Sequence, residues 1–133
     1  MSKKHIEVVA AVLRNKADVL AVQRAQSKLD YVSEKWEFPG GKVEVGETLV
    51  TAITRELDEE LRITVNDPKL LLTIEHSYPD FDLTMHCFVV EVTTRELELT
   101  EHIDSRWLSK DQLWDVDWAS ADIPVVEKLQ STF

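Results

Sequence analysis

The first apolar stretch of the chain predicts a buried β-strand. Residues 6–13 are mainly Val and Ala, and the run is shorter than an ordinary helix. Polar residues 15–18 predict a turn, and residues 19–24 are again rich in Val, Leu and Ala. The pattern therefore indicates two neighbouring strands joined by a tight turn.

The clearest helix is predicted over residues 48–61. Leu49, Ile53 and Leu57 recur at helical spacing, and no Gly or Pro interrupts the segment. Glu47 and Thr48 can both cap its start. We therefore expect an amphipathic helix whose apolar stripe packs on a sheet.

The segment before this helix predicts irregular structure. Residues 25–35 are polar and are typical of a surface loop. Residues 36–38 predict a short strand, which stops at residues 39–41 because Pro-Gly-Gly favours a sharp turn of the backbone.

The second half of the chain repeats the alternation of strands and helices. Residues 70–78 and 83–92 predict a hairpin closed through the intervening Pro-Asp-Phe-Asp. A further strand ends at Trp107-Leu108, and the capping-box pattern from Ser109 opens a short helix. A last helix covers residues 123–129, with Pro in its first turn. The mixture predicts an α+β fold, a mixed sheet with helices on its faces.

Composition places these elements in a single domain spanning residues 1–133. Hydrophobic residues make up 44% and charged residues 30%, which is ordinary for a soluble globular protein. The longest apolar run, residues 8–13, is far shorter than the ~20 residues of a membrane span, and no signal-peptide pattern follows Met1. With Cys87 as the one cysteine, we expect neither disulfides nor a thiolate zinc site, and a cytoplasmic location.

The formal net charge of −10 limits the classes of partner. Binders of duplex nucleic acid or anionic membranes usually carry a basic face, so we expect neither partner. A phosphate-bearing substrate stays compatible with an acidic protein if divalent cations bridge the two. The alternative role of the carboxylates is solubility.

Three glutamates on the predicted helix form the strongest candidate for chemistry. Glu56, Glu59 and Glu60 are three and four residues apart, so they lie on overlapping faces and repel one another. A hard divalent cation such as Mg²⁺ would turn this repulsion into attraction. Arg55 is placed to pair with a carboxylate and orient it. A plain acidic surface is the alternative that the spacing alone leaves open.

Those residues extend into a longer signature. Gly41, five residues, Glu47, seven residues, and then the run from Arg55 to Ile63 together resemble the Nudix box. Arg62 departs from it, because the box normally has a Gly that ends the helix in a left-handed conformation. Arg62 would be strained there, or the helix would end differently.

The resemblance implies the Nudix fold, an α/β/α sandwich around a mixed sheet, and hydrolysis of a nucleoside diphosphate linked to another group. It implies Mg²⁺ as cofactor, with Mn²⁺ as an alternative. The implied metal ligands are Gly41 through its carbonyl, Glu56, Glu59, Glu60 and Glu101. The same glutamates are the implied catalytic residues, with Arg55 orienting Glu47 and either Glu59 or Glu60 accepting the proton of the attacking water.

The likeness covers nearly the whole chain and favours one subgroup. Residues 36–42 and 121–129 resemble Nudix enzymes that act on 8-oxo-dGTP or CTP, and the first strand and the tail resemble the CTP enzymes more closely. Asp122 aligns with a residue that faces the base. A carboxylate can accept from the cytosine amino group or from guanine N1–H, so the base stays open. Asp122 can also cap the last helix, and both roles can hold together.

Other site residues are implied more weakly. Arg24 and Lys42 resemble phosphate or nucleotide contacts, with surface cations as the alternative. Phe38 and Tyr78 can flank a base or belong to the core. Glu101 resembles an additional metal-binding glutamate, with Glu98 as the alternative. The histidines lack zinc-ligand spacing and are expected to be structural or surface residues: His76, His86 and His102. The tryptophans are expected to belong to the core or the pocket wall: Trp107, Trp114 and Trp118.

The sequence thus predicts a pyrophosphohydrolase that converts a nucleoside triphosphate to the monophosphate. The favoured substrate is CTP, dCTP or a modified relative, and the alternative is 8-oxo-dGTP. A non-catalytic nucleotide-sensing module is the rival of another class, and the intact glutamate set argues against it. The sequence leaves open whether the protein is a monomer or a homodimer.

Overall fold

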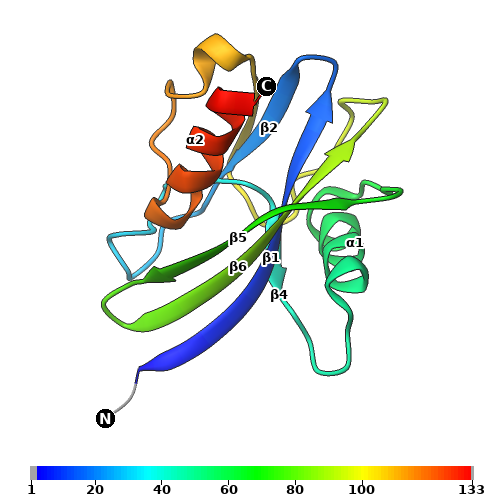
Figure 1. Cartoon of the computed structure of the whole chain (residues 1–133). Coiled ribbons are helices and arrows are strands. Elements are labelled where there is room, and N and C mark those ends of the chain that lie inside the picture. The colour runs from blue at the N-terminus through cyan, green and yellow to red at the C-terminus, as the bar shows by residue number, and fades with distance from the viewer. Residues whose placement is uncertain (1–2, 133) are drawn as a thin grey trace.

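A twisted mixed β-sheet forms the centre of the computed structural model, which describes residues 3–132 (Figure 1). The order of the main strands is β3-β2-β1-β6-β5, while β4 pairs with β1 and β7 with β2. The strands are β1 Lys4–Asn15, β2 Asp18–Gln23, β3 Trp36–Glu37, β4 Gly40–Lys42, β5 Lys69–Ser77, β6 Phe81–Glu91 and β7 Asp104–Leu108.

Both expected hairpins are present. β1 and β2 pair antiparallel beside their turn, where Lys16 takes a φ of 58°. β5 and β6 also pair antiparallel, with Ser77 opposite Asp82. β1 is longer at both ends than the apolar pattern predicts. Its polar start at Lys4 pairs in parallel with Phe81 of β6, so backbone pairing extends the strand beyond its buried part.

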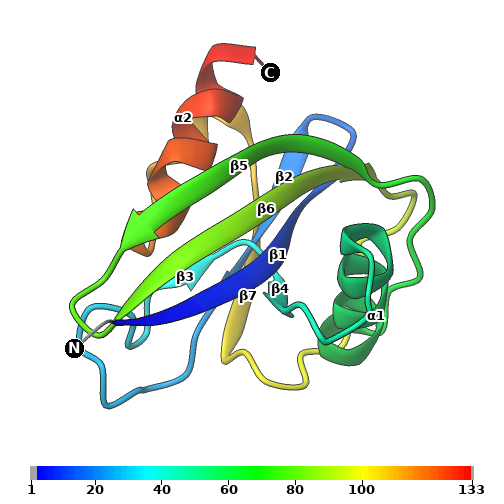
Figure 2. The same ribbon diagram turned by 60° about the horizontal axis from the view of Figure 1, so that its bottom comes forward.

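One helix covers each face of the sheet (Figures 1 and 2). Helix α1, Leu49–Leu61, packs its Ile53, Leu57 and Leu61 into one apolar cluster with alternate residues of β1 and β6. Helix α2, Ile123–Thr132, buries Val125, Val126 and Leu129 in a second cluster on the opposite face. The expected sandwich is therefore confirmed, and the last helix runs three residues beyond its predicted end.

The ends of α1 follow the expected chemistry. The Thr48 hydroxyl caps the helix by accepting from the Thr51 amide at 3.1 Å. At the other end Arg62 takes φ 57° and ψ 37°, and its amide donates to Asp58 at 3.0 Å. The helix thus ends in the left-handed conformation that usually takes glycine, although the residue carries a side chain.

Strand β4 was not predicted, because a Pro-Gly-Gly sequence favours a turn. Gly40 pairs with Ala10 of β1, and a side chain at Gly40 would collide with the carbonyl oxygen of Val9. The two backbones can approach this closely because Gly40 has no Cβ. This close packing pairs β4 with β1 within the sheet, where its Gly41 meets Glu56 of α1.

The segments near the C-terminus contain two 3₁₀ turns, Lys110–Gln112 and Ser120–Asp122. The predicted short helix at Ser109 is the first of them, and the Ser109 amide donates to Gln112 Oε1 at 3.0 Å, as the capping-box pattern requires. Among residues 3–132, no helix has the length and apolar character needed to cross a membrane.

Candidate functional site

Arg55 is the centre of the carboxylate cluster on α1. Its Nε and Nη2 donate to the two oxygens of Glu47 at 2.7 and 2.8 Å, forming a two-pronged ion pair. These bonds, together with the Glu44 amide, lower the pKa of Glu47 to about 2. Nη2 also donates to the Lys42 carbonyl at 3.1 Å. Arg55 therefore fastens the loop before α1 to the helix, as the orienting role implies.

The third nitrogen of the same guanidinium faces the helix glutamates. Nη1 lies 2.9 Å from Glu56 Oε1 and 3.2 Å from Glu59 Oε2. The Glu56 side chain is 13% exposed and that of Glu59 is 57% exposed, so the two differ in freedom to move. A Cβ on Gly41 would collide with the Glu56 carboxyl group. The absence of a side chain at Gly41 therefore lets the backbone of β4 meet the Glu56 carboxylate.

Glu60 lies deeper than the other glutamates of α1. Burial and then the negative charge of Glu56 raise the pKa of Glu60 well above its usual range, and Glu37 and Glu101 add to the effect. Glu60 Oε2 is buried and has no hydrogen-bond partner. A buried carboxyl oxygen without a partner is costly unless a ligand completes its surroundings.

These features fit a divalent cation, whose charge would relieve the repulsion and supply the missing partner of Glu60. In the part of the chain that the structure describes, no three His, Cys, Asp or Glu side chains are already arranged as a metal-binding group. Glu56 and Glu59 are held by Arg55 instead. Binding a cation would therefore require their carboxylates to turn from Arg55 towards Glu60.

The loop that carries Glu101 is fixed to the end of α1. The Glu98 amide donates to the Leu61 carbonyl at 2.9 Å, and the Thr100 amide donates to the Glu60 carbonyl at 3.1 Å. Glu101 is exposed, and its charge acts on Glu60. Glu101, and not Glu98, is among the charges that raise the pKa of Glu60, so Glu101 stays the candidate for the additional acidic residue of the site.

A pocket of about 330 Å³ opens beside the carboxylates. Strand β4 forms the shared wall, because Gly41 lines the pocket and also meets Glu56. Apolar residues such as Val8 and Met85 form much of the lining. All five side chains expected to bind substrate line this one pocket: Arg24, Phe38, Lys42, Tyr78 and Asp122.

The aromatic residues act as both pocket wall and core. Phe38 stacks on Trp118 with ring centroids 4.7 Å apart, and it is only 3% exposed. Tyr78 stacks on Tyr31 at 5.1 Å, and its hydroxyl accepts from the Ala121 amide at 3.0 Å. The alternatives left open for Phe38 and Tyr78 are thus compatible, since a buried ring can present one edge to the pocket.

Asp122 ends the second 3₁₀ turn, directly before α2. Its Oδ1 accepts from the Phe38 amide at 3.1 Å. The hydrogen bond of the Asp122 carboxyl thus joins two distant segments, and its role as a cap of α2 stays a prediction. Burial, and then the charge of Glu37, raise its pKa well above the usual range.

Two residues of the site were missed as functional candidates. Glu37 lines the pocket, and its Oε1 accepts from Arg24 Nη1 at 3.3 Å. His102 Nε2 lies 2.9 Å from Glu37 Oε2, and the His102 side chain is only 6% exposed. The available signals were the place of Glu37 in the short strand beside Phe38 and the position of His102 directly after Glu101.

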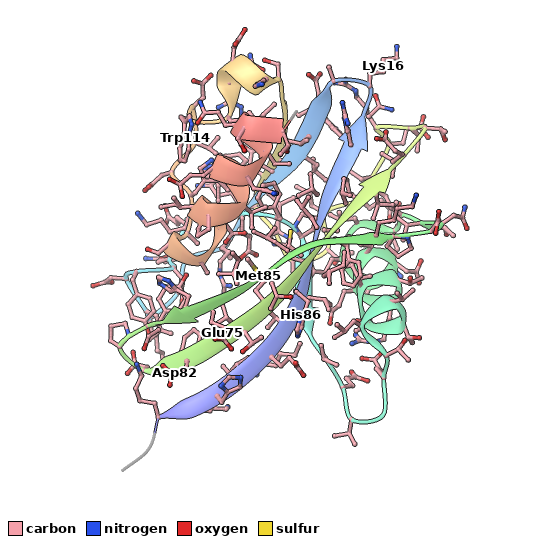
Figure 3. All side chains as sticks on the ribbon, in the orientation of Figure 1. Lys16, Glu75, Asp82, Met85, His86 and Trp114 are labelled. Carbon is pink, nitrogen blue, oxygen red and sulfur yellow. The ribbon has the colours of Figure 1, made fainter. Side chains whose placement is uncertain are left out.

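His86 lies on the other face of the sheet from this pocket. His86 Nε2 is 2.9 Å from Glu7 Oε2, and its Nδ1 is 3.0 Å from the Thr73 hydroxyl. His86 and Met85 are neighbours on β6 (Figure 3). Because successive residues of a strand point to opposite faces, Met85 lines the pocket while His86 points to the other side of the sheet.

Known proteins resemble the chain over nearly its full length. The NUDIX domain model matches residues 3–129. The 8-oxo-dGTP diphosphatase of Escherichia coli K12 is 32% identical over 127 residues, covering 96% of this chain and 98% of that protein. The CTP pyrophosphohydrolase of the same organism is 34% identical over 125 residues, covering 93% and 90%.

Solved structures agree with this assignment. The solution structure of the E. coli ORF135 protein is 33% identical, with a TM-score of 0.81 over 97% of this chain and 91% of that chain. The likeness in sequence and the likeness in structure both extend over the sheet, the two helices and the glutamate-bearing segment. The chain therefore belongs to the NUDIX family, and it is a hydrolase that acts on phosphoric anhydrides.

Proposed function

We propose that this protein is a Mg²⁺-dependent pyrophosphohydrolase that converts a nucleoside triphosphate to the monophosphate and pyrophosphate. One observation carries the proposal: Oε2 of Glu60 is buried without a hydrogen-bond partner in a glutamate cluster beside the pocket. Gly41 joins the two, because it meets the Glu56 carboxyl group of the cluster and also lines the pocket. A phosphate chain reaching from the pocket past Gly41 would meet this cluster.

The residues that would hold Mg²⁺ are Glu56, Glu59, Glu60 and Glu101, together with the Gly41 carbonyl. When bound, the cation polarises the phosphoryl group, activates a water and neutralises the leaving pyrophosphate. Arg55 supports this role by fixing Glu47 and the loop before α1. Glu59 and Glu60 are the candidates for accepting the proton of the attacking water, and Mn²⁺ is the expected alternative cation.

The pocket wall supplies groups suited to the rest of a nucleotide. Arg24 and Lys42 line the pocket and offer positive charge to the phosphates or another part of a nucleotide, although Arg24 also pairs with Glu37. The apolar lining and the buried rings of Phe38 and Tyr78 suit a planar base. Asp122 also lines the pocket, which supports a role for its carboxyl in recognising the edge of the base.

Two bases remain candidates, and each has a specific observation in its favour. The resemblance of the first strand and the tail to the CTP enzymes favours CTP, dCTP or a modified pyrimidine nucleotide, and the Asp122 carboxyl can pair with the cytosine edge. Similarity to the E. coli 8-oxo-dGTP diphosphatase over 98% of that protein favours 8-oxo-dGTP. Asp122 can serve both, because a carboxyl group can accept from the cytosine amino group or from guanine N1–H.

A panel of nucleoside triphosphates assayed with Mg²⁺ tests the reaction and the base together. The informative quantity is the ratio of kcat/KM values, because specificity is a difference between transition states. Release of pyrophosphate from at least one triphosphate is expected, and none across the panel would refute the reaction. Glu60→Gln should abolish that release in a folded protein, and unchanged turnover would refute the role of Glu60.

The role of Asp122 has its own test. Asp122→Asn should lower kcat/KM for CTP relative to 8-oxo-dGTP, because the Asn amide always carries an N–H donor, whereas a carboxylate presents acceptors to the cytosine amino group. An equal loss on both substrates would show that Asp122 only joins Phe38 to the start of α2.

A further inference from the structure

His102 lies between the nucleotide pocket and the glutamates of α1. Its Nε2 is 2.9 Å from Glu37 Oε2, and its Nδ1 is 3.8 Å from Glu60 Oε2. The side chains of His102 and Glu60 are each 6% exposed. Glu37 belongs to the pocket wall and Glu60 to the glutamate cluster, so one buried ring touches both parts of the site.

On the pocket side, the hydrogen bond defines the role of the ring. The Glu37 carboxylate accepts on Oε1 from Arg24 Nη1 at 3.3 Å, and His102 lies against its second oxygen. A carboxylate offers acceptors, so Nε2 of His102 must carry the proton and donate it. Arg24 and His102 together therefore hold both oxygens of Glu37 in one orientation at the pocket wall.

On the other side, two unsatisfied atoms face each other. Glu60 Oε2 and His102 Nδ1 are the buried side-chain atoms that lack a hydrogen-bond partner within residues 3–132. Their separation of 3.8 Å is too long for a direct hydrogen bond. Both atoms can therefore take part in hydrogen bonds around a ligand that Glu60 binds. Groups that lie beside a metal ligand in this way commonly orient it.

The backbone around His102 is held from two directions. Just before it, the Thr100 hydroxyl and amide bond to the last carbonyls of α1, including that of Glu60 at 3.0 and 3.1 Å. Just after it, the Ile103 amide donates to the Gln23 carbonyl of β2 at 3.0 Å. His102 is therefore a rigidly placed link, and not a surface side chain that contacts Glu37 by chance.

We propose that His102 is a positioning residue that links the two ends of the site. Through Nε2 it holds Glu37 for discrimination between bases, and through Nδ1 it completes the surroundings of Glu60 for divalent-cation affinity. The first half rests on the proposed nucleotide hydrolysis. The second half does not, because cation affinity can be measured without nucleotide.

Two isosteric substitutions separate these roles. The amide nitrogen of Gln can occupy the place of Nε2 as a donor, whereas the amide oxygen of Asn can occupy the place of Nδ1 as an acceptor. His102→Asn should therefore lower the kcat/KM ratio between the preferred and a competing triphosphate by ~10-fold, while His102→Gln keeps it within ~3-fold. The opposite order is expected for Mg²⁺ affinity of the nucleotide-free protein in a calorimetric titration, with a loss of ~10-fold in His102→Gln.

His86→Asn provides a matched control. It breaks another 2.9 Å contact between a histidine and a glutamate, on the face of the sheet away from the pocket (Figure 3). Both measured quantities should stay at their wild-type values in this variant. A change in His86→Asn equal to that in His102→Asn would overturn the proposal, because the effect would then be a general loss of stability.

Further outcomes are equally decisive. The linking role would be refuted if His102→Gln and His102→Asn lost base discrimination to the same extent and cation affinity to the same extent. It would also be refuted if neither variant lost either property. If both variants fail to fold, Glu37→Gln must reproduce the ~10-fold fall in the ratio, and an unchanged ratio refutes the pocket half. A wild-type protein without triphosphate turnover would refute the proposed function, whereas the Mg²⁺ titrations would still decide the cation half.

Discussion

The left-handed cap at Arg62 predicts a stability difference that can be measured. Arg62 takes φ 57° at the end of α1, where a Cβ is disfavoured. Relief of the left-handed conformation by Gly is worth roughly 1–2 kcal/mol. The greater conformational freedom of Gly in the unfolded chain reduces this gain in stability by about 0.4–1 kcal/mol. Arg62→Gly should therefore be about 0.5–1 kcal/mol more stable than Arg62→Ala, which keeps the Cβ.

The comparison with Ala, and not with the natural Arg, isolates the backbone effect. Both variants lose the favourable contact of a positive charge with the carboxyl end of a helix, worth about 0.3–1 kcal/mol. A chain of this length unfolds with an entropy near 280 cal/mol/K at ~2.1 cal/mol/K per residue. The expected gap in Tm between Arg62→Gly and Arg62→Ala is then about 2–4 °C.

Thermal unfolding followed by circular dichroism gives this gap directly, and urea unfolding provides an independent value. Exposed Thr64 is a suitable control position, because it lies just beyond the helix and is absent from the residues with positive φ. There the order should reverse, with Thr64→Ala more stable than Thr64→Gly. Equal stability of Arg62→Gly and Arg62→Ala would refute the assignment of strain to the cap.

Three further substitutions test the site and the start of α1. Gly41→Ala should weaken Mg²⁺ binding by ~10-fold or more in a calorimetric titration, because the new Cβ displaces the Glu56 carboxylate. Arg55→Lys should lower kcat by ~10-fold or more in a folded protein, since Lys cannot reproduce the two-pronged bond to Glu47. Thr48→Ala removes the helix cap and should lower Tm by about 3–4 °C, for a loss of about 1 kcal/mol. Wild-type values in any of these variants would contradict the corresponding role.

Local features of the fold could be predicted well because they depend on neighbours in sequence. The spacing of Leu49, Ile53 and Leu57 defines the buried stripe of α1, and the same helical repeat places Glu56 and Glu60 together. Pairing between distant segments could not be predicted in this way. β1 and β6 run in parallel, with Val8 opposite Met85, and no local pattern specifies such a register.

The long-range contacts of the site could not be predicted for the same reason. An Asp before a Pro-containing helix is a good cap by local criteria, yet Asp122 bonds to Phe38, 84 residues away. His102 lies in a polar segment and was expected to be structural or exposed. It becomes buried because its loop folds against the end of α1 and places the ring beside Glu37. Burial of a single histidine is set by tertiary packing, which a lone sequence does not reveal.

The guanidinium of Arg55 explains how the glutamate cluster can be stable and still available to a cation. Nε and Nη2 are engaged with Glu47 and the Lys42 carbonyl, which anchor the side chain. Nη1 alone contacts Glu56 and Glu59. A cation that takes these two carboxylates therefore displaces the contacts of one nitrogen and leaves the anchor to Glu47 intact. Because the anchor and the exchangeable contacts use different nitrogens, loss of Arg55 would affect the loop before α1 as well as the cluster.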